Sequence, residues 1–225
     1  IPVVLFDLKA KEGSANALID GALQKLAKLN PKPFGSSQAV NYITAANYED
    51  NLALLKDCDL IIEAIAERMD WKKDLYHNIA AYVATHTIIA SNTSGLSIES
   101  LTESLPTDLH AHFCGVHFFN PPRYMPLVEL IPHGGTKPEV LDQLESFLVQ
   151  KLGKSIIRAK DTPNFIANRL GVFSMLATCY YTEKFNIPLE VVDGLAVQVL
   201  VALVEVNLDD DRDHVRVETH GDLQC

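Results

Sequence analysis

His117 and Glu129 are polar side chains that interrupt apolar runs with the composition of β-strands. One run reads Cys114-Gly-Val-His-Phe-Phe-Asn-Pro-Pro, and the other reads Met125-Pro-Leu-Val-Glu-Leu-Ile-Pro. The link between them, residues 120–126, is too short for a helical crossover, so the two strands should be antiparallel neighbours. A carboxylate buried in such a strand needs a partner. The sequence therefore predicts that His117 and Glu129 meet as a pair.

Such a pair could act as a general base. A carboxylate beside an imidazole fixes its tautomer and stabilises its cation, which is what a base working near neutral pH requires. A core histidine satisfied by a structural salt bridge would give the same pattern, because ion pairs of both kinds perturb pKa values. These two residues alone leave the catalytic and the structural interpretation equally open.

Other polar residues follow the predicted strands at the points where those strands end. Asp7 ends the first strand, Glu67 lies just past the next, residues 91–94 follow the third, and His117 with Asn120 stands at the end of the fourth. Each alone fits a turn, a loop or a helix start. Ligands bind at the carboxyl ends of strands in open α/β sheets, so their coincidence on one edge favours a binding site.

The elements that position these residues alternate between strand-like and helical patterns, as in a mostly parallel α/β sheet of the Rossmann type. Strands are predicted at 1–7, 59–65, 87–90, the His117 and Glu129 runs and 154–159, and helices at 14–29, 48–56, 70–84, 97–104 and 138–152. Thr162-Pro163 should open a further, long apolar helix that ends near Lys184. We expect a sheet domain over 1–160, the start of a helical domain over 161–195, and a divergent tail over 196–225.

Composition narrows the class of protein. The chain has 225 residues, of which 48% are hydrophobic and 21% charged, enough for one globular domain or a domain and part of another. The longest apolar candidate, 195–206, is short and contains Gln198 and Glu205, so no membrane span is expected. A net charge of −10 argues against nucleic acid as a partner but not against a small polyanion on a local basic patch. Four cysteines without Cys-x-x-Cys spacing indicate a reducing compartment, by default the cytoplasm or an organelle matrix, of which we predict the cytoplasm, and they give no metal signal.

Four motifs carry a family resemblance: Ser91–Ser94, Gly115–Pro121, Leu127–Leu130 and Lys160–Arg169. In order and spacing the chain resembles NAD-dependent L-3-hydroxyacyl-CoA dehydrogenase from residue 1 to about residue 185. The segment near 30–45 is most similar to the dehydrogenase part of bacterial multifunctional fatty-acid oxidation proteins. The resemblance implies oxidation of L-3-hydroxyacyl-CoA to 3-oxoacyl-CoA with NAD in β-oxidation, by a homodimer or by part of a multifunctional protein.

The resemblance also implies roles for individual residues. His117 would be the general base, Glu129 its orienting partner, and Ser94 and Asn168 the contacts to the substrate hydroxyl and thioester region. Asp7 would hold the adenosine ribose and favour NAD over NADP. The other implied cofactor contacts are Glu67, Lys72, Asn92 and Asn120. The implied CoA contacts are Ser94, Lys72 and Lys28, the last about one residue out of register with the family's CoA-phosphate lysine.

One departure from the family pattern concerns the cofactor. The family has a strand and a Gly-x-Gly-x-x-Gly loop before the segment that corresponds to Ile1, and no such loop occurs in the 225 residues. Because that loop and its helix hold the pyrophosphate, we expect this chain alone to bind NAD weakly. Two parallel strands should also lack their shared neighbour. Two alternatives stay open: a catalytically disabled fragment that binds acyl-CoA or a partner chain, and a relative that oxidises a hydroxy acid without CoA.

Overall fold

A computed structural model describes residues 1–195 of the chain, and the predicted tail over 196–225 lies outside this range. The chain divides into two units, Ile1–Arg169 and the part from Leu170 onward. The sequence predicts this boundary near residue 160. The segment before Arg169 belongs to the first unit because Phe165 is buried in its core and the backbone at Ile166 bonds to Glu129.

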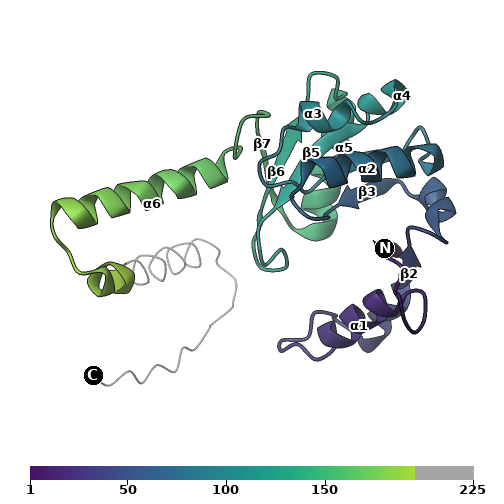
Figure 1. Cartoon of the computed structure of the whole chain (residues 1–225), viewed down its shortest axis with the longest axis horizontal. Helices are drawn as coiled ribbons and strands as arrows, with labels where there is room; N and C mark the ends of the chain where they lie inside the picture. The colour runs from purple at the N-terminus through teal and green to yellow at the C-terminus, as the bar shows by residue number, and fades with distance from the viewer. Residues whose placement is uncertain (196–225) are drawn as a thin grey trace. The chain divides into compact units, whose positions relative to one another are not determined.

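The main sheet has five strands in the order β3-β4-β5-β6-β7 (Figure 1). The strands are β3 (Leu60–Glu63), β4 (Ile88–Ser91), β5 (Phe113–Phe118), β6 (Leu127–Pro132) and β7 (Ser155–Arg158). Neighbours are parallel except β5 and β6, which are antiparallel. The predicted Rossmann-like, mostly parallel sheet is therefore confirmed, including the antiparallel pair that carries His117 and Glu129.

A second, two-stranded sheet lies at the N-terminal end of the chain. There β1 (Val3–Asp7) pairs in parallel with β2 (Ile43–Asn47). Within residues 1–195 no strand joins β1 to β3. The strand β2 is not among the elements predicted from the sequence, and its sequence Ile-Thr-Ala-Ala-Asn holds two alanines, which are poor strand formers.

Two hydrophobic clusters cover opposite faces of the main sheet, because successive side chains of a strand point to opposite sides. One cluster contains Ile89 and Phe113 and packs against α2 (Met69–Ile79) and α3 (Ile98–Thr102). The other contains Ala90 and Val116 and packs against α5 (Pro138–Leu152). Further helical segments of the first unit are α1 (Ala17–Leu26), α4 (Thr107–His110), and the 3-10 turns Ser37–Tyr42, Leu52–Asp57 and Ala80–Tyr82. Within residues 1–195, no helix is long and apolar enough to cross a membrane.

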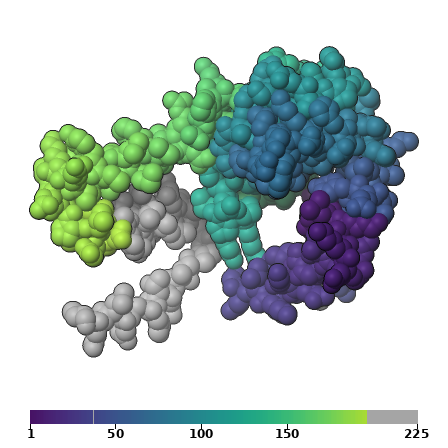
Figure 2. Space-filling model, in the orientation of Figure 1, coloured from purple at the N-terminus to yellow at the C-terminus, as the bar shows by residue number. Residues whose placement is uncertain are grey.

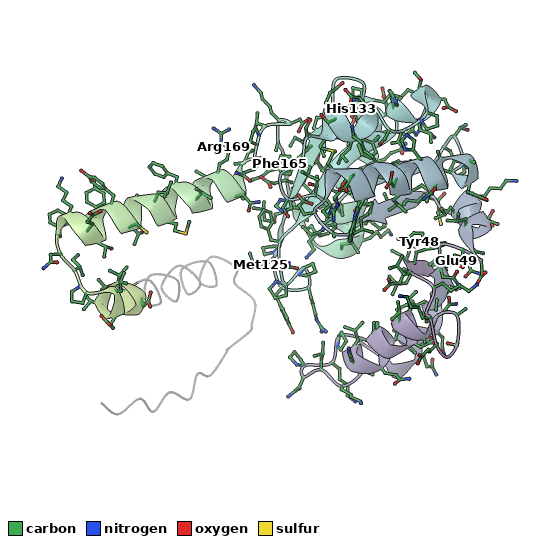
Figure 3. The ribbon with its side chains drawn as sticks, in the orientation of Figure 1. Tyr48, Glu49, Met125, His133, Phe165 and Arg169 are labelled. Atoms are coloured by element: carbon green, nitrogen blue, oxygen red, sulfur yellow. The ribbon has the colours of Figure 1, made fainter. Side chains whose placement is uncertain are left out.

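Helix ends show where local signals hold and where they fail. The helix α5 ends as predicted at Gly153, which adopts a left-handed φ of 63°. The predicted start of the long helix at Thr162-Pro163 was wrong, because α6 spans Ala167–Lys184. Asn164 and Phe165 have φ values of 62° and 48°, which are incompatible with a right-handed helix. After this turn Phe165, labelled in Figure 3, is buried in the hydrophobic core of the first unit.

The loop between β5 and β6 projects from the main sheet (Figure 2). Its residues 121–126 are all exposed. Arg123 Nη1 donates a hydrogen bond of 2.6 Å to the carbonyl oxygen of Lys32, and Lys154 Nζ donates to the carbonyl oxygens of Pro122 and Met125. The loop is therefore held at both sides by backbone carbonyl contacts.

Candidate active site

The pairing register of β5 and β6 places His117 directly opposite Glu129. The two side chains meet with 2.8 Å between His117 Nδ1 and Glu129 Oε2, and they are 4% and 0% exposed. A carboxylate oxygen can only accept, so Nδ1 carries the proton and Nε2 carries the lone pair. No described residue is hydrogen-bonded to Nε2. The predicted pair is thus formed, and its geometry leaves the basic nitrogen available.

The second oxygen of Glu129 is bound at the start of α6. Backbone N–H groups of Ile166 and Ala167 both donate to Glu129 Oε1 at 2.9 Å. The first N–H groups of a helix lack partners within the helix and carry its positive dipole end, so they complement the negative charge of the carboxylate. Glu129 is therefore fixed on one side by a helix start and on the other by His117.

Aromatic rings surround the imidazole. The ring centroid of Phe119 lies 4.5 Å from that of His117, and the centroid of Phe165 lies at 5.8 Å. Phe165 reaches this position because of the left-handed turn that precedes α6. These rings restrict the rotation of His117 and keep water from its edges, so a base there works in a low-dielectric setting.

The loop that follows β4 is fastened by Glu67. Glu67 Oε1 accepts hydrogen bonds from Thr93 Oγ1 at 2.6 Å, from the backbone N–H of Ser94 at 2.8 Å and from that of Gly95 at 3.2 Å. Burial acts to raise the pKa of Glu67, but the hydrogen bonds from Thr93, Ser94 and Gly95 and the charge of Lys72 lower it overall. The carboxylate therefore holds the loop in its charged form.

Ser94 and Asn168 lie next to each other. Asn168 Nδ2 donates a hydrogen bond of 3.1 Å to the backbone oxygen of Ser94, whose side chain is exposed. Asn92 Oδ1 accepts from the backbone N–H of Phe118 at 2.9 Å and so connects this loop to the end of β5, next to His117. The hydroxyl of Ser94, the amide of Asn168 and the imidazole thus belong to one connected region.

Lys72 lies where it cannot meet a ligand directly. Its side chain is 0% exposed, and its Nζ is 2.6 Å from Glu63 Oε1 and 3.3 Å from the carbonyl oxygen of Ile65. The expected direct contacts of Lys72 with NAD and CoA are not available in this arrangement. The physical reason is that this face of α2 packs against β3, where the buried Glu63 carboxylate needs a counter-charge.

Glu63 is a residue that we did not select from the sequence. It lies inside the apolar run Leu60–Ile65, which we had assigned to a strand. The signal that singled out Glu129, a carboxylate interrupting a strand-like run, was also present here.

The remaining predicted residues occupy exposed positions. Asp7 ends β1, and its Oδ1 accepts from the backbone N–H of Leu8 at 2.7 Å. Asn120 is exposed just past the end of β5, and Lys28 is exposed just past α1. No hydrogen bond or ion pair within residues 1–195 joins Asp7 or Lys28 to the other predicted residues. In the same part of the chain no group of three or more His, Cys, Asp or Glu could hold a metal ion.

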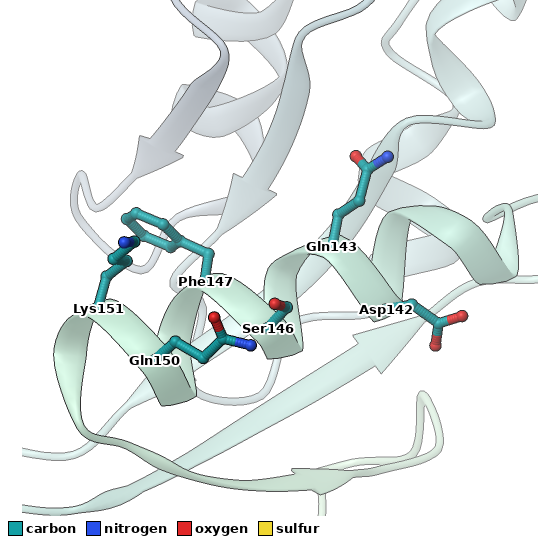
Figure 4. A pocket seen from close by; sticks show the side chains of 6 residues that line it. All are labelled: Asp142, Gln143, Ser146, Phe147, Gln150 and Lys151. Carbon is teal, nitrogen blue, oxygen red and sulfur yellow. The ribbon is translucent and has the colours of Figure 1, made fainter.

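A hollow of about 450 Å³ on the surface lies elsewhere (Figure 4). All its lining residues belong to α5: Asp142, Gln143, Ser146, Phe147, Gln150 and Lys151. None of them belongs to the region around His117. The candidate site is therefore defined by its side-chain geometry and not by this hollow.

Comparisons with known proteins agree with this geometry. Residues 1–162 match the family described as 3-hydroxyacyl-CoA dehydrogenase, NAD binding domain. A Rickettsia felis protein named as a fatty acid oxidation complex trifunctional enzyme is 45% identical over 76% of this chain and 24% of its own length. A Bacillus subtilis protein named as a 3-hydroxyacyl-CoA dehydrogenase is 41% identical over 77% of this chain and 22% of its own.

Solved structures give the same result. The crystal structure of (S)-3-hydroxybutyryl-CoA dehydrogenase from Ralstonia eutropha superposes with a TM-score of 0.68 at 32% identity, covering 84% of this chain and 66% of that one. The chain spans about a quarter of the length of the two relatives named above. The family match over residues 1–162, together with the paired His117 and Glu129, shows that the chain belongs to the 3-hydroxyacyl-CoA dehydrogenase family and carries its NAD-binding domain.

Proposed function

We propose that the protein oxidises the hydroxyl group of an L-3-hydroxyacyl-CoA to a 3-oxo group, with NAD as the oxidant. The observation that carries the proposal is the orientation of His117, whose Nδ1 is bound to Glu129 at 2.8 Å while Nε2 keeps its lone pair. Oxidation of a secondary alcohol needs a base at the hydroxyl proton, and this nitrogen is suited to it. The relatives' names support the substrate class.

Four residues of the chain would transfer the proton and orient the substrate. His117 Nε2 takes the hydroxyl proton, and the resulting imidazolium is stabilised by the Glu129 carboxylate, which the start of α6 holds in place. The hydroxyl of Ser94 and the amide of Asn168 orient the substrate oxygen, each contributing on the order of 10²-fold if well placed. The chemistry that bound NAD supplies is acceptance of the hydride from C3.

Several residues fit the cofactor. The carboxylate of Asp7 is exposed at the carboxyl end of β1, and an acid at this place suits the ribose hydroxyls and disfavours the extra phosphate of NADP. Asn120, which is exposed just past β5, and the amide nitrogen of Asn92 can contact other parts of the bound NAD. Glu67 and Lys72 fit an indirect role in cofactor binding, because their side chains form hydrogen bonds within the protein, Glu67 with the Ser94 backbone and Lys72 with Glu63.

The wider setting of the protein is also a proposal. The trifunctional relative favours a role within a multifunctional β-oxidation protein, and a homodimer is the other arrangement we expect. Lys28, an exposed cation, is the candidate contact for a CoA phosphate. The cytoplasm stays the predicted location.

The test compares thioester and free acid. The full-length protein is assayed for NADH formation with L-3-hydroxybutyryl-CoA, with its D-enantiomer and with free L-3-hydroxybutyrate, and a His117→Ala variant serves as control. We expect turnover of the L-thioester only, and its loss in the variant. Equal rates on the free acid would favour the relative that acts without CoA. An inactive protein that still binds acyl-CoA would favour the disabled binding form.

A further inference from the structure

A buried carboxylate with four donors lies beneath the candidate site. Glu63, Lys72, Tyr76 and Ser91 are all at most 3% exposed. Glu63 Oε1 accepts from Lys72 Nζ at 2.6 Å and from the backbone N–H of Ile65 at 2.7 Å. Glu63 Oε2 accepts from Tyr76 Oη at 2.9 Å and from Ser91 Oγ at 2.7 Å. We call these four side chains the Glu63 network.

Stability alone is a weak reason for such a network. The cost of desolvating a buried ion pair often cancels its attraction, and apolar residues of similar volume can replace it. The network is nevertheless fully satisfied: burial and the nearby charge of Glu63 hold the pKa of Tyr76 well above its usual value, so the phenol stays a donor. A satisfied network of this kind can instead fix the position of a neighbouring group.

Lys72 connects the network to the loop of Ser94. Its Nζ lies 2.6 Å from Glu63 Oε1 and 3.7 Å from Glu67 Oε2. The other oxygen of Glu67 is the acceptor for the backbone N–H groups of Ser94 and Gly95. A chain of contacts thus runs from Glu63 through Lys72 and Glu67 to the residue proposed to orient the substrate hydroxyl.

The charges along this chain must balance. With Glu63 charged, the ammonium of Lys72 has a close partner, and Glu67 can direct its Oε1 at the loop. If Glu63 lost its charge, Glu67 would be the only carboxylate that the described residues place within ion-pair distance of Lys72. The ammonium of Lys72 is fully buried and needs a counter-charge, so it would draw the carboxylate of Glu67, whose side chain is 43% exposed, away from Ser94 and Gly95.

We propose that Glu63 is a positioning residue for Ser94, because it neutralises Lys72 and thereby leaves Glu67 free to hold the Ser94–Gly95 backbone. This role rests on the proposed function only in so far as Ser94 orients a substrate. The position of the loop itself can be tested without activity.

The main variant is Glu63→Gln. Its amide oxygen can accept from Lys72 and Ile65, and its amide nitrogen can donate to the hydroxyls of Tyr76 and Ser91, so the hydrogen bonds persist and only the charge is lost. Tyr76→Phe is the matched control. It removes one hydrogen bond from the same carboxylate and keeps the Glu63–Lys72 pair.

Two readouts are compared in the full-length protein. Amide hydrogen exchange at Ser94 and Gly95 should become faster in Glu63→Gln and stay unchanged in Tyr76→Phe. Turnover of L-3-hydroxybutyryl-CoA should fall roughly 10- to 100-fold in Glu63→Gln, with a smaller change in KM, because a misplaced orienting group costs rate more than binding. Tyr76→Phe should lower thermal stability with a smaller loss of kcat.

The outcomes separate the two proposals. Unchanged exchange at Ser94 and Gly95 in folded Glu63→Gln overturns the positioning role, as does a loss of kcat that merely follows stability equally in both variants. If Glu63→Gln does not fold, Glu63→Asp replaces it, because the shorter side chain keeps the charge but withdraws it from Lys72. This variant should also speed exchange at Ser94 and Gly95 and lower kcat, and unchanged values overturn the positioning role. An unaltered protein that is inactive on the thioester refutes the proposed function, while the exchange experiment still decides the inference.

Discussion

Replacement of Glu129 by Gln should abolish most of the activity by reversing the tautomer of His117. In the structure, Glu129 Oε1 accepts from two backbone N–H groups, those of Ile166 and Ala167. Only an oxygen can occupy that position, so the glutamine nitrogen must take the position that faces His117 Nδ1 at 2.8 Å. An amide NH₂ is a donor, which forces Nδ1 to accept and moves the ring proton to Nε2. The nitrogen that should take the substrate proton is then already protonated.

The size of the effect follows from this reversal. Loss of a general base costs about 10²- to 10⁴-fold, and a wrong tautomer in a comparable carboxylate–histidine pair reaches the upper end, about 10⁴. We therefore expect kcat to fall by about 10³- to 10⁴-fold, or about 4 to 5.5 kcal/mol in the barrier. Substrate binding should change little, because Glu129 is fully buried.

The assay measures kcat and KM for L-3-hydroxybutyryl-CoA, with thermal unfolding as a check on folding. Glu145→Gln is the matched control, since Glu145 pairs with Arg158 at 2.7 Å on the exposed face of the same unit. It should leave kcat unchanged, because exposed ion pairs contribute little. A folded Glu129→Gln variant with the kcat of the unaltered protein would refute the tautomer argument and restore the purely structural interpretation of the pair.

Three further outcomes are expected. Asp161→Ala should lower the free energy of unfolding by about 1 to 2 kcal/mol in a denaturant titration, because Asp161 Oδ2 accepts from the backbone N–H of Glu99 at 2.9 Å in the first turn of α3. Cys114 should resist alkylation at neutral pH while Cys179 reacts, as mass spectrometry of trapped peptides can show, because burial raises the pKa of the Cys114 thiol to about 12 and Cys179 is exposed. The pKa of Glu67 is lowered in the folded state, so its stabilising contribution is complete above the ordinary carboxyl value and is lost as the pH falls through the lowered one. An acid-unfolding curve of Glu67→Gln should therefore lack that part of the pH dependence, and a curve parallel to that of the unaltered protein would contradict this.

The sequence was sufficient for features that depend on nearest neighbours along the chain. The link between β5 and β6 is too short for a helical crossover, so the two strands had to be antiparallel neighbours. A polar residue in each apolar strand needed a partner, and the register that places His117 opposite Glu129 confirms this pairing. Gly153 marked the end of α5 for a similarly local reason. By contrast, β2 forms because β1 offers it a parallel partner, with Val3 opposite Ile43, and this cannot be read from its alanines.

The start of α6, which the sequence signal misplaced, is determined by tertiary packing. Thr162-Pro163 is a sound local start signal, yet the chain turns left-handed at Asn164 and Phe165 so that Phe165 can fill the core beside His117. The helix then begins at Ala167, where its free N–H groups meet Glu129. A contact between a strand carboxylate and a helix start so far along the chain has no signature in either segment alone.

Glu63 and Glu129 show how one sequence signal leads to two different roles. Each is a carboxylate in an apolar strand, and one oxygen of each accepts from the backbone, from one N–H group at Glu63 and from two at Glu129. Glu129 has as its second partner an imidazole, which can exchange a proton near neutral pH, whereas Glu63 meets an ammonium, a phenol and a hydroxyl that all remain donors. Strand register places His117 opposite Glu129 and Ser91 opposite Glu63, and the helix α2 supplies Lys72 and Tyr76. Partner chemistry, more than burial, therefore separates the carboxylate proposed to serve the reaction directly from the one proposed to hold the loop beside it.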